Sequence, residues 1–264
     1  MKFGIIQGRL TDSTNGELQC FPKENWTNEF QLCTQSGYDY IEFFVEETHN
    51  PNNPIWTDEG INLIKKQATT TNLNCYSICN DYIIKHNLLK KDTLEQCKTL
   101  IKQAAKCNIK LLVLPLFKAS QFNLETMLDY KSPLFLLADF AKKHDICLSL
   151  ETHLAGKDVL NFFTTHSHDN IFLTYDTGNC FSCGHDIYSD ISLLYPFINH
   201  VHIKDKNLNQ ENVCLGEGQI DFNKICYIFK KNGYNKAMTF ETSRGNNPLL
   251  TAKSNIKLIK GYLR

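Results

Sequence analysis

Short apolar segments alternate eight times with longer amphipathic segments along this chain, and this alternation constrains the fold more than any other feature. We expect the apolar segments to be strands, and they lie at residues 2–7, 40–45, 74–79, 110–116, 146–151, 171–176, 200–204 and 237–241. We expect helices at residues 25–37, 57–71 and 92–107, and within 121–144, 156–166, 186–197, 221–232 and 248–262. Strands that alternate with helices predict a parallel sheet covered by helices, and eight such units close naturally into a (β/α)8 barrel.

An open, doubly wound sheet is the alternative fold for the same alternation. That fold commonly binds dinucleotides through a glycine-rich turn after its first strand, and no GxGxxG sequence follows residues 2–7. No linker rich in Pro, Gly or Ser divides the chain, so we expect one barrel domain over residues 1–264. The polar segments 12–19 and 46–54 are expected to be loops over one end of the barrel.

Residues typical of helix ends support three of these helices. Gly37 follows the first predicted helix, as a C-terminal glycine does. Thr57 is the expected N-cap of the second. Asp92, with Glu95 three residues later, forms a capping-box pattern at the start of the third.

The charge balance limits the classes of partner. Lys plus Arg number 28 and Asp plus Glu number 28, so the formal net charge is +0. A balanced chain has no basic surface typical of nucleic-acid binding and no attraction to an anionic membrane. The first residues, MKFGIIQGRL, carry too short an apolar run for a signal peptide, and no run approaches the length of a membrane span. We therefore expect a cytoplasmic protein that binds neither nucleic acid nor membrane.

The 11 cysteines are scattered and odd in number, which favours reduced thiols used as small apolar side chains. Cys180 and Cys183 form a CxxC sequence. A structural zinc site would require a second pair at suitable spacing, and the sequence has none.

Acidic residues and a histidine fall at the ends of the last four predicted strands. The strands end in Glu151, Asp176 and Glu241, and the segment HVHIKDK (200–206) carries His202. In a barrel these side chains would meet at the carboxyl end of the strands, where barrel enzymes carry out their chemistry. Each residue alone has a simpler explanation, because strand-end carboxylates often cap helices and buried histidines are often hydrogen-bonded core residues.

Together the four residues predict a metal site. Three closely packed carboxylates repel one another, and a divalent cation removes that repulsion. Oxygen ligands with one nitrogen suit Mn²⁺, Mg²⁺, Co²⁺ or Fe²⁺, with Zn²⁺ as a further option. His200 lies on the same strand face as His202 and is expected one layer deeper, whereas Asp205 and the lysines of this segment are expected at the rim of a substrate pocket.

The chain resembles the sugar isomerase/epimerase superfamily, whose fold is the xylose isomerase-like TIM barrel. The resemblance covers nearly the whole length and is carried by the segments GIIQGRL, FPKENWTNEF, YIEF, SICNDY, LETH, YDTGN, HVHIKD, LGEGQIDF and TFET, in this order. It implies that Glu151, Asp176, His202 and Glu241 hold one divalent metal ion. It also implies that Glu151 and Glu241 are the acid/base pair of a sugar isomerase or epimerase that acts through a cis-enediolate.

Two positions depart from the ketose 3-epimerase branch of this superfamily. Asn179 and Leu208 stand where that branch has a histidine and an arginine that contact substrate. Other candidate substrate-binding residues are His153, Lys204, Arg244, Glu42, Asn80, Asp81, Gln7 and Arg9, and an apolar wall is expected from Phe43, Trp56 and Phe117.

Other functions use the same fold. A lyase of the inosose dehydratase type shares the four ligands. An endonuclease acting at abasic sites would require a histidine-rich set for three zinc ions, and the strand ends IEFFV, SICND and VLPLF contain no histidine. A non-catalytic sugar-binding barrel would not need converging metal ligands. The expected partner is a small-molecule sugar or sugar derivative, and since such barrels often pair, a homodimer stays open.

Overall fold

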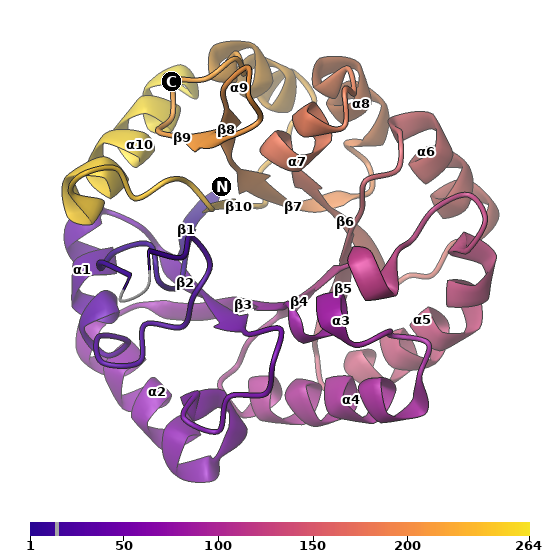
Figure 1. Cartoon of the computed structure of the whole chain (residues 1–264), viewed down its shortest axis with the longest axis horizontal. Helices are drawn as coiled ribbons and strands as arrows, with labels where there is room; N and C mark the ends of the chain where they lie inside the picture. Colours follow the sequence, from indigo (N-terminus) through magenta and orange to yellow (C-terminus); the bar gives the residue numbers. More distant parts are fainter. Residues whose placement is uncertain (14–15) are drawn as a thin grey trace.

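Eight parallel strands form a closed barrel in the computed structural model of the chain, which describes residues 1–13 and 16–264 (Figure 1). Around the barrel the strands follow the order β1 (Lys2–Ile6), β10 (Ala237–Phe240), β7 (Ile198–Ile203), β6 (Ile171–Asp176), β5 (Cys147–Glu151), β4 (Leu111–Pro115), β3 (Asn74–Asn80) and β2 (Tyr40–Val45). Each overlaps a predicted strand. The closed order confirms the predicted barrel and excludes the open sheet.

The main helices form a ring outside the barrel, and each lies between consecutive strands or after the last (Figure 1). They are α1 (Asn28–Ser36), α2 (Asp58–Thr71), α4 (Lys91–Lys106), α5 (Met127–Lys142), α6 (Gly156–Thr165), α8 (Ile187–Leu194), α9 (Phe222–Lys231) and α10 (Pro248–Tyr262). Each bears buried apolar residues that pack on the strands, as the amphipathic pattern predicts. Within the described residues, no helix is both long and apolar enough to span a membrane.

Two of the three predicted helix caps are confirmed. Gly37 follows α1 with a left-handed φ of 84°, and the Thr57 hydroxyl accepts a 3.0 Å hydrogen bond from the Gly60 N–H at the start of α2. The Asp92 cap is wrong, because α4 begins at Lys91 and places Asp92 inside its first turn. A carboxylate there still interacts favourably with the positive end of the helix dipole.

Several short elements that the sequence did not predict follow the carboxyl ends of the strands. They are η1 (Pro54–Trp56), α3 (Tyr82–Lys85), η2 (Lys118–Ser120), α7 (Thr177–Ser182) and the hairpin of β8 (Asp205–Lys206) with β9 (Asn212–Val213). Residues 12–13, 16–19 and 46–53 have no regular structure, as expected, whereas Pro54 begins η1; positions 14 and 15 of the first predicted loop lie outside the described residues. These segments surround the end of the barrel where the candidate ligands lie.

The register of three neighbouring strands brings candidate residues together. Asp176 of β6 and Thr239 of β10 each pair with His202 of β7. Because side chains alternate along a strand, His200 and His202 point to the same face. A pair of histidines therefore enters the barrel interior from β7.

Candidate active site

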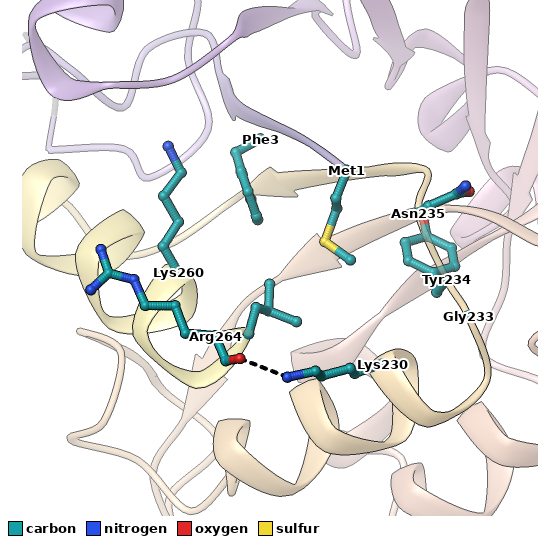
Figure 2. A pocket seen from close by; sticks show the side chains of 9 residues that line it. Met1, Phe3, Lys230, Gly233, Tyr234, Asn235, Lys260 and Arg264 are labelled. Carbon is teal, nitrogen blue, oxygen red and sulfur yellow. Dashed lines mark hydrogen bonds between the residues drawn. The ribbon is translucent and has the colours of Figure 1, made fainter.

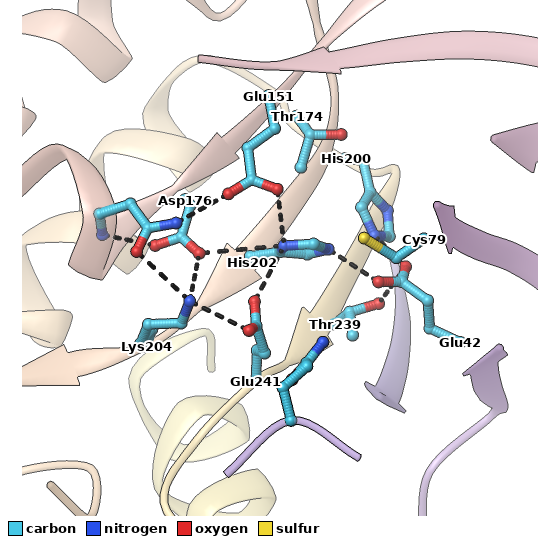
Figure 3. A network of polar contacts seen from close by, with 12 residues as sticks. Glu42, Cys79, Glu151, Thr174, Asp176, His200, His202, Lys204, Thr239 and Glu241 are labelled. Atoms are coloured by element: carbon cyan, nitrogen blue, oxygen red, sulfur yellow. Dashed lines mark hydrogen bonds and ion pairs between the residues drawn. The ribbon is translucent and has the colours of Figure 1, made fainter. Parts of the chain in front are cut away.

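Three carboxylates converge on one nitrogen of His202 (Figure 3). Its Nδ1 atom lies 3.5 Å from Glu151 Oε2, 3.9 Å from Asp176 Oδ2 and 3.2 Å from Glu241 Oε2. Glu151 and Asp176 end strands β5 and β6, and Glu241 directly follows β10, where its N–H donates to the Ile203 carbonyl. The fold thus gathers the four residues that strand-end spacing selected.

The other nitrogen of His202 faces Glu42. The Nε2 atom lies 2.8 Å from Glu42 Oε1, and Glu42 Oε2 lies 2.6 Å from His200 Nε2. Ser77 and Thr239 also donate their hydroxyls to Glu42 Oε2, over 2.6 and 3.1 Å. A neutral imidazole that donates its Nε2–H to Glu42 presents the lone pair of Nδ1 to the three carboxylates.

This arrangement fits a divalent cation. Nδ1 of His202 is buried and forms no hydrogen bond with any residue that the structure describes. A lone pair directed at three carboxylate oxygens is repulsive unless a positive charge lies among them. Three oxygens and one imidazole nitrogen are ligands that divalent metals accept.

Lys204 supplies one positive charge to the cluster. Its Nζ lies 3.0 Å from Asp176 Oδ2 and 3.1 Å from Glu241 Oε1, and the residue is only 6% exposed. A Cβ added to Gly178 would lie 2.7 Å from Lys204 Cγ, so the glycine leaves room for the lysine stem. Lys204 was predicted to contact substrate, and its ammonium pairs with two of the protein's own carboxylates.

The pKa shifts describe the same electrostatics. Burial raises the pKa of Asp176 to about 6, although the neighbouring Lys204 opposes the shift. Burial also acts to raise the pKa of Glu241, but Lys204 and His202 outweigh it and hold that pKa below its usual range. Burial alone would lower the pKa of His202, whereas Glu42 and the other carboxylates raise it well above the usual value. The crowded carboxylates therefore favour positive charge on the neighbouring Lys204 and His202 side chains.

Glu151 and Glu241 each have one anchored oxygen and one that faces the centre. Glu151 Oε1 accepts a 2.9 Å hydrogen bond from Asn179 Nδ2. Glu241 Oε1 pairs with Lys204 and lies 3.7 Å from Arg9 Nη2. The free Oε2 atoms of both residues face Nδ1 of His202. Two carboxylates held in this way can approach one bound molecule from different strands.

A cavity of about 240 Å³, called here the inner cavity, opens above the cluster. Its wall includes Glu151, Glu241 and four of the predicted substrate-binding residues, which are Arg9, Asp81, Asn179 and Lys204. Phe117 lies in the same wall, as expected of an apolar contact. Burial raises the pKa of Asp81 to about 8, and the charge of Glu241 adds to that shift. Burial lowers the pKa of Arg9 to about 10.

Three residues that were predicted to contact substrate do not line this cavity. Glu42 is fully buried between the two histidines, because it stands in the middle of β2 and points into the barrel. Gln7 accepts a 3.3 Å hydrogen bond from the Phe44 N–H. Asn80 is fully buried and donates to Cys97 Sγ over 3.4 Å. None of these three residues lines the inner cavity: Glu42 points into the barrel interior, whereas Asn80 faces helix α4.

Three further residues are directed away from the cavity. Arg244 donates from Nε to the carbonyls of Gly8 and Thr11, over 2.7 and 3.1 Å, so it anchors the N-terminal loop. Asp205, expected at the substrate rim, is fully buried and accepts from the N–H groups of Gly216, Gly218 and Ile220. His153 stacks on Phe117 outside the inner cavity.

Two of the three aromatic residues expected to form an apolar wall, and Leu208, lie away from the inner cavity. Phe43 is buried in the core, and Trp56 packs against the core and His49, so neither forms the expected wall. Leu208 is 78% exposed beyond β8 and does not line the inner cavity.

Some wall residues of the inner cavity were not predicted. Cys79 comes from β3, and the alternation of side chains along that strand, with Asn80 turned away, could have revealed it. Leu18, Gln19 and Asn212 come from the N-terminal loop and the hairpin, and no local pattern marks them.

A cavity of about 580 Å³ lies at the opposite end of the barrel (Figure 2). Phe3 near the start of β1, and Tyr234 and Asn235 before β10, line it. Among the described residues, its lining includes no Asp, Glu, His or Cys side chain. The inner cavity is therefore the candidate active site, although it is smaller.

Comparisons with known proteins give matches over most of the chain. The family model described as xylose isomerase-like TIM barrel matches residues 30–262. An L-ribulose-5-phosphate 3-epimerase of Escherichia coli is 23% identical over 228 residues, which cover 80% of each chain.

Solved structures show the same fold. The structure of an L-ribulose 3-epimerase is similar with a TM-score of 0.78 and 19% identity, covering 99% of this chain and 94% of that chain. The structure of a 3-keto-D-glucoside 4-epimerase from Escherichia coli is similar with a TM-score of 0.76 and 17% identity, covering 99% of both chains.

Proposed function

The chain belongs to the xylose isomerase-like TIM barrel family, and from this premise we propose that it is a divalent-metal-dependent sugar isomerase or epimerase. Its relatives are sugar epimerases that bear the names L-ribulose-5-phosphate 3-epimerase and L-ribulose 3-epimerase. Glu151, Asp176, His202 and Glu241 would hold one divalent ion. The reaction is the movement of a proton at the carbon beside a sugar carbonyl.

One observation carries the proposal. Nδ1 of His202 is a buried atom without a hydrogen-bond partner among the described residues, and carboxylate oxygens from three strands lie 3.2–3.9 Å from it. Capping accounts for only one of these oxygens, since Asp176 Oδ1 accepts from the Asn179 N–H as the N-cap of α7. Asp176 Oδ2, Glu151 Oε2 and Glu241 Oε2 are directed at a shared centre. The inner cavity lies directly over that centre and has room for a small substrate.

Glu151 and Glu241 are suited to transfer the proton. When bound, the ion would supply Lewis-acid polarisation of the substrate oxygens. One glutamate removes the proton from the carbon beside the carbonyl, and the electron pair of that C–H bond moves toward the carbonyl oxygen. The other glutamate returns a proton to the opposite face, which inverts that carbon. Asn179 holds Glu151 in position, and Lys204 and Arg9 hold Glu241.

The first test is the metal content of the purified protein, measured by inductively coupled plasma mass spectrometry. We would compare wild type with His202→Ala and with the matched control His49→Ala, which removes an exposed histidine. About one divalent ion per chain, retained in the control and lost in His202→Ala, would support the proposal. No bound ion after loading with Mn²⁺ or Co²⁺ would overturn it, and three zinc ions would favour the endonuclease alternative.

Activity is tested by the incorporation of solvent deuterium into ketoses and aldoses in D₂O. Exchange at the carbon beside the carbonyl that requires the loaded ion supports an isomerase or epimerase. Loss of water from the substrate without such exchange would instead indicate the dehydratase-type alternative.

A further inference from the structure

A second cavity, called here the outer chamber, adjoins the inner cavity. It measures about 500 Å³, and Ile84, Phe117 and Asn179 line both spaces. The inner cavity measures about 240 Å³, which is below the roughly 300 Å³ at which pockets for drug-sized ligands begin. The inner cavity therefore suits a single sugar unit, and the outer chamber has room for a further group attached to it.

The wall of the outer chamber combines an aromatic surface with amides. The rings of Phe117 and His153 stack with their centroids 4.0 Å apart and an interplanar angle of 15°. Gln121 contributes a side-chain amide. Asn123 contributes its Nδ2 group, since its Oδ1 already accepts from the N–H groups of Glu125 and Thr126. The Asn179 amide also lines the chamber but already donates to Glu151. Amides both donate and accept hydrogen bonds, as sugar hydroxyls require, and a flat ring surface suits the C–H face of a pyranose.

Each Lys or Arg that the described part of the structure places in the two walls already has a partner. Lys118, which lines the outer chamber, pairs with Glu47 over 2.8 Å. In the inner cavity, Arg9 donates to the Leu18 carbonyl and to Gln19, and it lies beside Glu241. The Lys204 ammonium lies between Asp176 and Glu241. A phosphate would therefore have to displace existing partners.

We propose that the substrate is a neutral glycoside of the reacting sugar, with the reacting unit in the inner cavity and a second sugar unit on the Phe117–His153 surface. This inference rests on the proposed function and adds its substrate class. It distinguishes this chain from an enzyme that acts on a sugar phosphate, because ring stacking and amide hydrogen bonds would recognise the second sugar unit.

Calorimetric titration of the metal-loaded protein tests the inference without requiring turnover. The probes are D-fructose, D-fructose 6-phosphate, and two disaccharides that carry a hexosyl group on O4 or O6 of fructose. We expect at least one disaccharide to bind about tenfold more tightly than D-fructose. The inference would be overturned if D-fructose 6-phosphate bound more tightly than both disaccharides, or if neither disaccharide bound more tightly than D-fructose.

Variants assign the gain to the outer chamber. His153→Ala is expected to weaken disaccharide binding about tenfold and to affect D-fructose less than twofold. The control His144→Ala removes a histidine outside both cavities and should change neither affinity. An equal loss for both ligands in His153→Ala would contradict the two-part site. Metal content is measured on the same samples, so that a failed metal site is distinguished from a wrong substrate class.

Discussion

The two nitrogens of His202 face regions with opposite properties. Below it, the Glu42 oxygens accept hydrogen bonds from two histidines and two hydroxyls, and Glu42, His200 and His202 are fully buried. Above it, three carboxylates surround an atom that has no hydrogen-bond partner among the described residues, and two of them, Glu151 and Glu241, line the inner cavity.

The two nitrogens of His202 therefore have different roles: the contacts of Nε2 stabilise the fold, and the surroundings of Nδ1 serve the proposed chemistry. A buried hydrogen-bonded network such as the one around Glu42 stabilises the fold and holds the imidazole in a single orientation. An incomplete charged cluster costs stability, and proteins keep such clusters where they bind ions or reactants. We therefore expect substitutions above His202 to affect activity, and substitutions below it to affect folding.

Glu241→Gln should give the largest effect. Removing a proton-transfer carboxylate is expected to slow deuterium exchange into substrate by about 10²–10⁴-fold. The melting temperature in chelator should fall, because Lys204 and His202 stabilise the ionised carboxylate and lose this partner, but it should fall by less than in Glu42→Ala. The exposed Glu217→Gln serves as the control and should retain exchange. Full activity in Glu241→Gln would break the comparison.

Glu42→Ala should reverse that pattern. It leaves His200, Ser77 and Thr239 without their buried partner, so the free energy of unfolding is expected to fall by about 3–5 kcal/mol. Urea unfolding measures this change, with the isosteric Glu42→Gln expected to lose less. A loss below about 1 kcal/mol would mean that the lower network does not stabilise the barrel.

Lys204→Met tests whether a metal ion and the ammonium share a role. In chelator the variant should lose about 1.5–3 kcal/mol, because charge-assisted hydrogen bonds to Asp176 and Glu241 disappear. With saturating Mn²⁺ the loss should shrink, since the ion supplies positive charge to the same carboxylates. The exposed Lys143→Met provides the baseline. An identical loss with and without Mn²⁺ would argue against a cation site.

Asp81→Asn should give the smallest effect at acidic pH, and its effect on stability should grow as pH rises. The pKa of Asp81 is raised to about 8 in the folded protein, so folding disfavours its ionised form. Wild type therefore loses stability as pH rises from about 4, the pKa of an unperturbed Asp, to about 8. The advantage of Asp81→Asn in urea unfolding with chelator should grow over this interval and then level off. A pH-independent difference, equal to that of the exposed Asp12→Asn, would refute the shift.

The barrel was predictable because its determinants are local. Parallel strands that are buried on both faces appear in the sequence as apolar runs. Each outer helix appears as an amphipathic segment, with apolar residues at helical spacing on the face that packs on the strands. The four-residue α3 and six-residue α7 were missed, since so few residues carry no periodicity. The hairpin of β8 and β9 was missed for the same reason, as each strand has only two residues.

The site was predictable only where position along a strand decides it. Glu151, Asp176 and Glu241 gather because the ends of parallel strands meet at one rim. Glu42 lies mid-strand, and the sequence did not show that it would pair with residues of β7. Arg244 reaches carbonyls more than 200 positions away in sequence, and its long side chain can turn toward either the cavity or the loop. Such choices depend on tertiary packing.

Substitutions at Gly178 and Lys204 should depend on each other during evolution. Any side chain at position 178 would press on the lysine stem, so a mutation there is tolerated only if position 204 has already become smaller. The reverse order is open, because shortening Lys204 leaves Gly178 unhindered. A substitution of Lys204 by a smaller residue should therefore precede any substitution of Gly178. Related barrels that carry alanine in place of this glycine should lack the lysine.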